Sequence, residues 1–270
     1  MTRPAPTAEF ASLVYGRDGV SIDDPAEAFH EASRLYPNIA PGRLTTLLTL
    51  AASSELQQTV ERASRTHAHR PQIELPDGVL PRRSLSELLD ARRSTLNEHC
   101  GSLPLADLSA LLRASYAASP RGTDGLRRPV PSGGALYPLE LYVLLLQLEG
   151  VDPCVSHYNP FRHTLELIAP LARPDVGACL VEPSLADRAA ALIVVTSFFW
   201  RSRFKYGARG YRFALLEAGH VVQNALLAAA ALELDALPLG GFYDQRLDRL
   251  VGADGLDEAS VYALLLGGRR

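Results

Sequence analysis

The sequence predicts an α+β protein in which helices cover a central sheet. Helical patterns come first along the chain, and strands then alternate with helices, which is the order expected of an α+β sheet. The stretch LELYVLLLQL, residues 139–148, has the composition of a strand buried on both faces. A helix expected from Arg209 to about Leu234 is apolar on nearly every side, so we expect it at the centre of the fold.

The composition is that of an ordinary globular protein. The 270 residues are 47% hydrophobic and 21% charged, and the formal net charge is -3, so the chain has no general attraction for nucleic acid or for an anionic membrane. The opening MTRPAPTAEF lacks the apolar stretch of a secretory signal, and we expect a cytoplasmic location. Three well-separated cysteines without a C-x-x-C pair predict neither a disulfide framework nor a zinc site.

Residues 1–80 are expected to form a helical extension that is separable from the main domain, residues 81–270. Helices are predicted within 23–36, where acidic residues precede the pattern, and within 41–65. Residues 66–83 contain three prolines and are expected to be a non-helical connection. The extension is a candidate docking element for a substrate or a partner.

The main domain is expected to begin with two helices. Ser84 caps the first, and Glu87, three residues later, completes a capping box. The second covers 103–119 as an amphipathic pattern. The further elements expected are a hairpin over 155–169 that turns at Asn159 and Pro160, a helix near 175–190, a strand over 190–200, a short helix over 245–252 and a last strand over 260–267.

Three short stretches are candidates for binding an anionic cofactor. ARRS at 91–94 ends a helix with two guanidinium groups and a hydroxyl, which match phosphate geometry. PSGGALYP at 131–138 and PLGGFYD at 238–244 contain small residues where the main chain can approach a flat ligand. An exposed arginine pair and two ordinary turns are the alternatives at this point. The dinucleotide-binding and P-loop glycine motifs are both missing from the sequence.

The order of these stretches resembles one family. RRS, PSGGALYPLELYV, FKYGARGYRFALLEAGHVVQNALLAAAALEL, PLGGFYD and a strand ending in LLLG together closely resemble the nitroreductase-like flavoproteins. Within them, the resemblance is to the SagB-type dehydrogenases, which oxidise azolines in peptide natural products. It covers residues from about 84 to 268. It implies a nitroreductase-like fold with a mixed or antiparallel sheet, and an interlocked homodimer with FMN at the subunit interface.

The resemblance also implies roles for individual residues. Arg92, Arg93 and Ser94 match the motif that contacts the FMN phosphate and ribityl chain. The other matched positions are Pro131, Ser132 and Gly133, which meet the flavin from its other side, Gly240 and Gly241, whose main chain lies over flavin N5 and O4, and Arg269, which is a candidate for a further phosphate contact. No metal ligand is implied.

The chain contains 26 arginines and a single lysine, Lys205. Azoline oxidation removes a proton from one ring carbon and a hydride from the next, so a base is required. Arginine cannot serve, because its pKa exceeds about 12, whereas lysine can. The resemblance implies that Lys205 and Tyr206 form the catalytic Lys-Tyr pair of azoline-oxidising members. A surface lysine and a tyrosine that only packs its ring are the alternatives.

The expected function is therefore that of an FMN-dependent oxidoreductase that converts thiazoline or oxazoline rings of a peptide intermediate to thiazole or oxazole. The expected partners are a second copy of the chain, an azoline-containing peptide or carrier-bound substrate, and a cyclase or carrier protein. One alternative is an NAD(P)H-dependent reductase of dehydroamino acids, quinones or nitro compounds. Another is a flavin-free docking or scaffold member of a biosynthetic complex.

Overall fold

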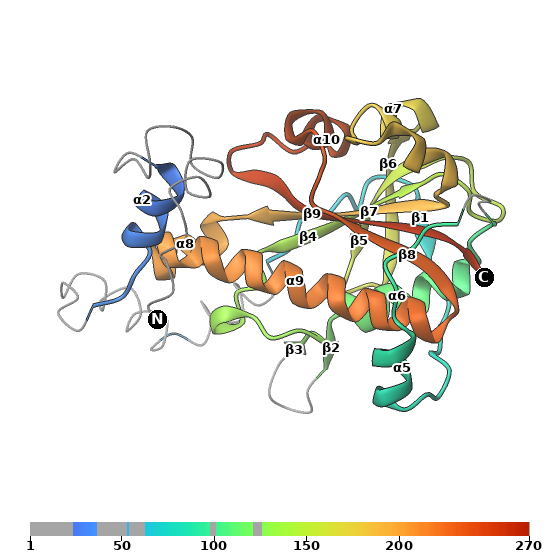
Figure 1. Cartoon of the computed structure of the whole chain (residues 1–270), viewed down its shortest axis with the longest axis horizontal. Coiled ribbons are helices and arrows are strands. Elements are labelled where there is room, and N and C mark those ends of the chain that lie inside the picture. Colours follow the sequence, from blue (N-terminus) through green and yellow to red (C-terminus); the bar gives the residue numbers. More distant parts are fainter. Residues whose placement is uncertain (1–23, 37–52, 54–62, 98–100, 121–125, 270) are drawn as a thin grey trace, which may run out of the picture.

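The structure is a computed structural model that describes residues 24–36, 53, 63–97, 101–120 and 126–269 (Figure 1). Its centre is a seven-stranded sheet with the strand order β1-β6-β5-β4-β7-β9-β8. All of the strand pairs in this sheet are antiparallel. The α+β fold class is confirmed, and of the two sheet types expected the antiparallel one is observed.

The described elements follow one another along the chain as the sequence analysis broadly predicted. The helices are α2 (Pro25–Ala32), α5 (Leu85–Ala91), α6 (Leu105–Tyr116), α7 (Arg173–Gly177), α8 (Trp200–Tyr206), α9 (Ala208–Ala231) and α10 (Asp244–Val251), with the 3-10 helices η1 (Gly133–Ala135) and η2 (Pro183–Arg188). The strands of the main sheet are β1 (Gln72–Glu74), β4 (Leu139–Leu145), β5 (Cys154–Asn159), β6 (Thr164–Pro170), β7 (Ala191–Phe198), β8 (Leu234–Leu239) and β9 (Glu258–Arg269). A separate two-stranded sheet joins β2 (Ser119–Pro120) to β3 (Leu126–Arg127).

Strand β4 lies at the centre of two apolar layers. Every residue of β4 is buried, as the run of apolar residues predicted. Leu141 and Val143 belong to the core that contains α6 and α9, whereas Tyr142 and Leu144 belong to the core that contains α7, η2 and α10. Because side chains alternate along a strand, one strand supplies both layers. Figure 1 shows α9 along one face of the sheet and α7 with α10 on the other.

The long helix is real, but it is shorter than predicted. It begins after Gly207, whose φ of 58° separates α8 from α9, and it ends before Glu233, whose φ of 59° reverses the chain. The predicted end near Leu234 is wrong because the chain leaves the helix there and pairs with β9 as strand β8. The local sequence did not predict this strand, because its apolar residues continue the helical pattern of α9.

By length and composition, α9 is apolar enough to cross a membrane, as the core helices of many globular proteins also are. Half of its most apolar stretch is buried inside the protein. It packs against α6 and against strands of the sheet, which is the central position predicted for it.

Most of the other predicted elements are confirmed. Ser84 accepts a hydrogen bond from the main-chain N–H of Glu87, and the Glu87 carboxylate accepts one from the main-chain N–H of Ser84, so the capping box is present. Strands β5 and β6 form the predicted hairpin. The single helix expected near 175–190 is wrong, since α7 and η2 are two short helices with residues 178–182 between them, and Pro183 begins the second.

The first 80 residues divide between a helix and an added strand. The predicted helix within 23–36 is present as α2, with Asp24 as its N-cap. The predicted helix within 41–65 lies almost entirely outside the described residues. Within the predicted connection 66–83, residues 72–74 form β1 and pair with β6. This part of the extension is therefore joined to the sheet of the main domain.

The capping box of α5 gives a prediction about stability. Ser84→Ala should lower the free energy of unfolding by about 1 kcal/mol, because it removes the side-chain acceptor for an N-terminal main-chain N–H. Urea unfolding measures this change. Ser86→Ala, inside the same helix and also exposed, is the matched control and should be neutral or slightly stabilising. Equal unfolding midpoints for the two variants would contradict the role of Ser84.

Candidate functional site

Lys205 and Tyr206 meet the glycine-rich segment 131–134 at the junction between α8 and α9. They are the last two residues of α8, and Gly207 then turns the chain into α9. Gly134 has a φ of 69°, and a Cβ atom on it would lie 2.5 Å from Tyr206 Oη and 2.8 Å from Lys205 Nζ. Glycine at position 134 therefore lets the two polar groups approach the main chain.

Aromatic packing supports this contact. The Tyr206 ring packs edge to face on Phe213 of α9, with 4.9 Å between ring centroids. A Cβ on Gly133 would lie 2.8 Å from the Phe213 ring, so this glycine is also in close contact with α9. Lys205 Nζ lies 5.3 Å from the centroid of the Tyr206 ring. The structure thus brings Gly134, the residue after the predicted Gly133, together with both members of the predicted Lys-Tyr pair.

A buried acid lies behind the same segment. Glu217 of α9 is 1% exposed and accepts a hydrogen bond of 2.9 Å from the Tyr116 hydroxyl. Burial raises the pKa of Glu217 to about 7, although Ser132, Tyr116 and the charge of Arg128 act in the opposite direction. The Ser132 hydroxyl in turn accepts a hydrogen bond of 2.9 Å from the main-chain N–H of Tyr137. Glu217 was not predicted, and its signal is an isolated acid in an apolar helix.

The predicted phosphate-binding residues lie elsewhere, beside the edge strand β8. Arg92 follows α5 directly and donates a hydrogen bond of 3.2 Å to the Ser94 hydroxyl. Arg93 donates to the main-chain oxygens of Asp90 and Arg92. In the described part of the chain, neither guanidinium is paired with a carboxylate. Thr95, which follows Ser94, forms a β-bridge with Ala236 of β8.

Gly240 and Gly241 follow the end of the same strand. Both are exposed, and a Cβ on Gly240 would meet no atom within 4 Å, so a ligand has room to approach the main chain there. Gly240 lies four positions after Ala236, which is about 13 Å of extended chain. Arg92 and Ser94 at one end, and open main chain at the other, fit a molecule that carries a phosphate on one end and a flat ring on the other.

Arg269 has a different neighbour from the one expected. Its guanidinium donates to both carboxylate oxygens of Asp107, at 2.8 and 2.9 Å. This bidentate pair holds the end of β9 to α6. A contact between Arg269 and a phosphate would have to compete with Asp107.

The predicted site residues therefore form two groups that one chain does not bring together. Lys205, Tyr206 and segment 131–134 lie at the beginning of α9. Arg92–Ser94 lies near the end of α9, where Arg83 and Glu233 form an ion pair of 2.7 Å. A helix of this length spans about 36 Å.

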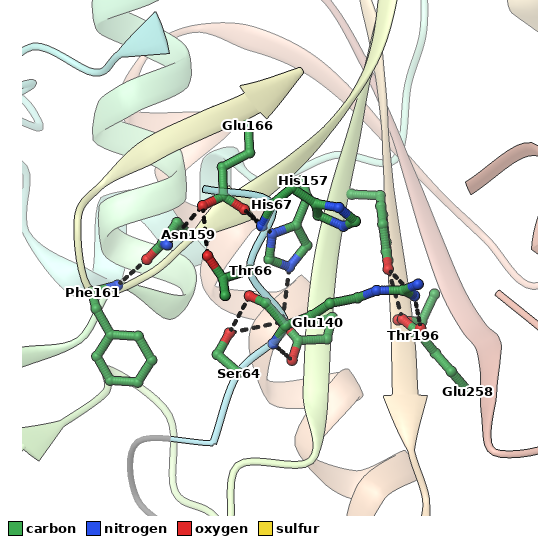
Figure 2. Close-up of polar contacts among 12 residues, drawn as sticks. Ser64, Thr66, His67, Glu140, His157, Asn159, Phe161, Glu166, Thr196 and Glu258 are labelled. Carbon is green, nitrogen blue, oxygen red and sulfur yellow. Dashed lines mark hydrogen bonds and ion pairs between the residues drawn. The ribbon is translucent and has the colours of Figure 1, made fainter. Parts of the chain in front are cut away.

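A second polar cluster, which the sequence analysis did not predict, lies between the main sheet and residues 64–67. Figure 2 shows three glutamates from different strands facing the segment 64–67. Glu140, Glu166 and Glu258 are each no more than 2% exposed. Buried carboxylates require hydrogen bonds and opposite charges, and the segment supplies many of them. The signal in the sequence is a single acid inside each of two mainly apolar strands, Glu140 in β4 and Glu166 in β6, whereas Glu258 is the first residue of β9.

His157 connects two of these carboxylates. Its Nε2 lies 2.9 Å from Glu140 and its Nδ1 lies 3.2 Å from Glu166. Burial disfavours the charged ring, but hydrogen bonds to the two acids raise the pKa of His157 above its usual value. Burial would likewise raise the pKa of Glu140, but the hydrogen bond to His157 and the charge of Arg201 bring it to about 2. The two acids are therefore ionised near neutral pH, and their hydrogen bonds favour the charged form of the ring between them.

No group of three or more histidine, cysteine, aspartate or glutamate side chains in the described ranges is arranged to hold a metal ion. At the junction of α8 and α9, a lysine and a tyrosine lie against a glycine-rich loop.

The antiparallel sheet, the buried helix and this junction define an α+β protein of the nitroreductase type. A family model described as the nitroreductase family matches residues 89–268, and the chain belongs to this family. It is therefore an oxidoreductase in general terms.

Relatives and structures add detail. The chain is 35% identical over 186 residues to MJ1384 of Methanocaldococcus jannaschii, a protein named by inference as a nitroreductase, with 67% of this chain and 89% of the relative covered. It is 30% identical over 171 residues to the Escherichia coli microcin B17-processing protein McbC, and the match spans 61% of each. A chain of the E. coli microcin synthetase McbBCD complex, solved with truncated pro-MccB17 bound, shares the fold with a TM-score of 0.59 at 23% identity, covering 89% of this chain and 86% of that one.

The contact at Gly134 gives a prediction about the single lysine. Gly134→Ala should push the ends of Lys205 and Tyr206 away and strain the loop, because the new Cβ would meet both groups and an alanine rarely adopts a φ of 69°. Amine-specific labelling of Lys205, followed by mass spectrometry, should then become faster. Gly219→Ala, where a Cβ meets no neighbour, should leave the rate unchanged. Equal labelling rates in the two variants would show that Gly134 does not confine the amine.

Glu217 gives a prediction about pH and stability. Its folded pKa of about 7 is above the value for an exposed glutamate, so the folded state binds this proton more tightly than the unfolded state. Stability should therefore fall as pH rises from about 4.5 to about 7, by about 3 kcal/mol in total.

Glu217→Gln removes this titration. The variant should gain stability relative to the native protein at pH 8, and the gain should be smaller at pH 5. Urea unfolding at both pH values measures it. A difference that does not depend on pH would contradict the raised pKa.

Proposed function

We propose that this protein is an FMN-dependent oxidase that converts thiazoline or oxazoline rings of a peptide intermediate to thiazole or oxazole. The observation that carries the proposal is the contact of Lys205 and Tyr206 with Gly134, in the segment that resembles the flavin-facing segment of azoline-oxidising flavoproteins. Membership of the nitroreductase family supports the flavin. Similarity to McbC, a microcin-processing protein, supports a peptide substrate.

In this proposal Lys205 removes the proton. Its neutral amine accepts a proton from one ring carbon of the azoline, and Tyr206 donates a hydrogen bond that orients the ring or the amine. Bound FMN would supply the acceptor for the hydride from the adjacent carbon, and an external acceptor such as dioxygen would finally take up the two electrons. Arginine at position 205 would also be a long basic side chain, but it could not accept this proton.

Arg92 and Ser94 would hold the phosphate, and Gly240 with Gly241 would lie against the ring. These residues are exposed or half-buried and are directed to no carboxylate among the described side chains. Arg93 is placed beside them, although it is occupied with main-chain oxygens. Arg269 is the weakest member of the predicted set, because Asp107 already binds it.

A homodimer would complete the site. One chain holds Lys205 with segment 131–134 at one end of α9 and Arg92–Ser94 at the other, so a second copy in the opposite orientation would bring the two groups together. Exposed apolar side chains on α8 and α9 support such an interface, namely Trp200, Phe204, Leu215 and Leu216. We propose a peptide-modifying partner protein as well, by analogy with the complex that contains the structural neighbour.

A reductase that takes hydride from NAD(P)H is the second candidate. The observation that favours it is the similarity to MJ1384, which covers 89% of a protein named as a nitroreductase. Such a reductase has no need of a base at position 205. The two functions therefore differ in how strongly they depend on Lys205.

The test uses the purified full-length chain with an azoline-containing peptide. Mass spectrometry should detect the loss of two hydrogens, and both Lys205→Ala and Lys205→Arg should lower the rate by roughly a hundredfold or more while FMN content stays the same. Absorbance of the bound flavin measures that content. Full turnover by Lys205→Arg would exclude Lys205 as the base, and NAD(P)H-dependent reduction without azoline turnover would favour the reductase.

A further inference from the structure

Two described parts of the N-terminal region lie near Lys205 and Tyr206, which are the last residues of α8. Helix α2 lies beside the first turns of α9, where Arg212 donates to the Ser33 hydroxyl at 2.7 Å and to the main-chain oxygen of His30 at 2.8 Å. The ring of Phe29 packs on Tyr211, with 5.3 Å between centroids. Residues 64–67 lie at the other side, in the buried cluster shown in Figure 2.

Glu140 is shared between residues 64–67 and the helix that carries Lys205. One carboxylate oxygen accepts from the Ser64 hydroxyl at 3.0 Å, and the other accepts from the main-chain N–H of Arg65 at 2.7 Å. The second oxygen also accepts from Arg201 of α8 at 2.5 Å. The buried charge of Glu140 therefore fixes both the segment 64–67 and helix α8.

Glu258 and Glu166 hold the segment from its other sides. The Arg65 guanidinium is paired with Glu258 and donates to the Tyr142 hydroxyl at 3.0 Å. Glu166 accepts from the main-chain N–H of His67 at 2.6 Å and from the Thr66 hydroxyl at 3.2 Å. If the segment left, three buried carboxylates would lose donors together, so the segment is bound as a unit.

We propose that Glu140 is a positioning residue that couples residues 64–67 to helix α8, so that the seated segment holds Lys205 in place against Gly134. Lys205 follows Arg201 by four residues on α8, which is about one turn, and movement of Arg201 therefore moves the amine. The N-terminal region then acts as a support for the base, in addition to any docking role. This inference rests on the proposed function only for the catalytic meaning of Lys205.

The test measures Lys205 itself, without flavin or substrate. Because the chain has one lysine, amine labelling followed by mass spectrometry reports on this side chain, and Trp200, the single tryptophan, lies at the first position of α8. Arg65→Gln should raise the labelling rate of Lys205 by roughly tenfold. It should also shift Trp200 emission.

Arg70→Gln is the matched control, because Arg70 is exposed in the same stretch and has no contact with the three glutamates. It should change neither signal. Ser64→Ala removes a single hydrogen bond to Glu140 and provides a milder variant if Arg65→Gln fails to fold. It should give a smaller change in the same direction.

A double variant separates coupling from general loosening. Arg201→Gln should also speed labelling, and Ser64→Ala with Arg201→Gln should be no faster than the faster single variant, because both side chains act through Glu140. Multiplied effects, or native labelling and emission in Arg65→Gln and Ser64→Ala, would overturn the proposal. Azoline turnover, measured separately, tests the proposed function, so either idea can fail without the other.

Discussion

The rest of the structure depends on how the charge of Glu140 is compensated inside the sheet. A carboxylate in a strand whose other residues are apolar is tolerated only when donors surround it. Here the donors come from His157 on the neighbouring strand, from Arg201 on α8, and from residues 64 and 65. The compensation of one charge thus fixes the position of a strand, a helix and an incoming segment relative to one another.

The two apolar layers around β4 have a complementary role. They bury α9 against one face of the sheet and leave its two ends with different chemistry. The beginning of α9 holds a lysine, a tyrosine and a glycine-rich loop, and its end lies beside arginines and the edge strand β8. A rigid helix keeps these groups apart within one chain, which is the reason for proposing a homodimer that would build one site from both.

Much of the fold could be predicted because its signals are local. The capping box at Ser84 and Glu87, the buried strand 139–145 and the hairpin at Asn159 each depend on residues close together in sequence. The errors have a common cause. Residues 234–239 continue the pattern of α9, but pairing with β9 makes them a strand, and residues 72–74 become a strand only because β6 has an open edge there.

The sequence by itself determined the family resemblance, the types of element and the single lysine followed by tyrosine, because these depend on residue identity and short-range spacing. Only the tertiary structure placed Lys205 against Gly134, paired Arg269 with Asp107 and surrounded three isolated glutamates with donors. Many of these contacts join residues far apart in the sequence, up to 193 positions between Arg65 and Glu258. Which donor reaches a buried charge is decided by packing, and no local pattern encodes it.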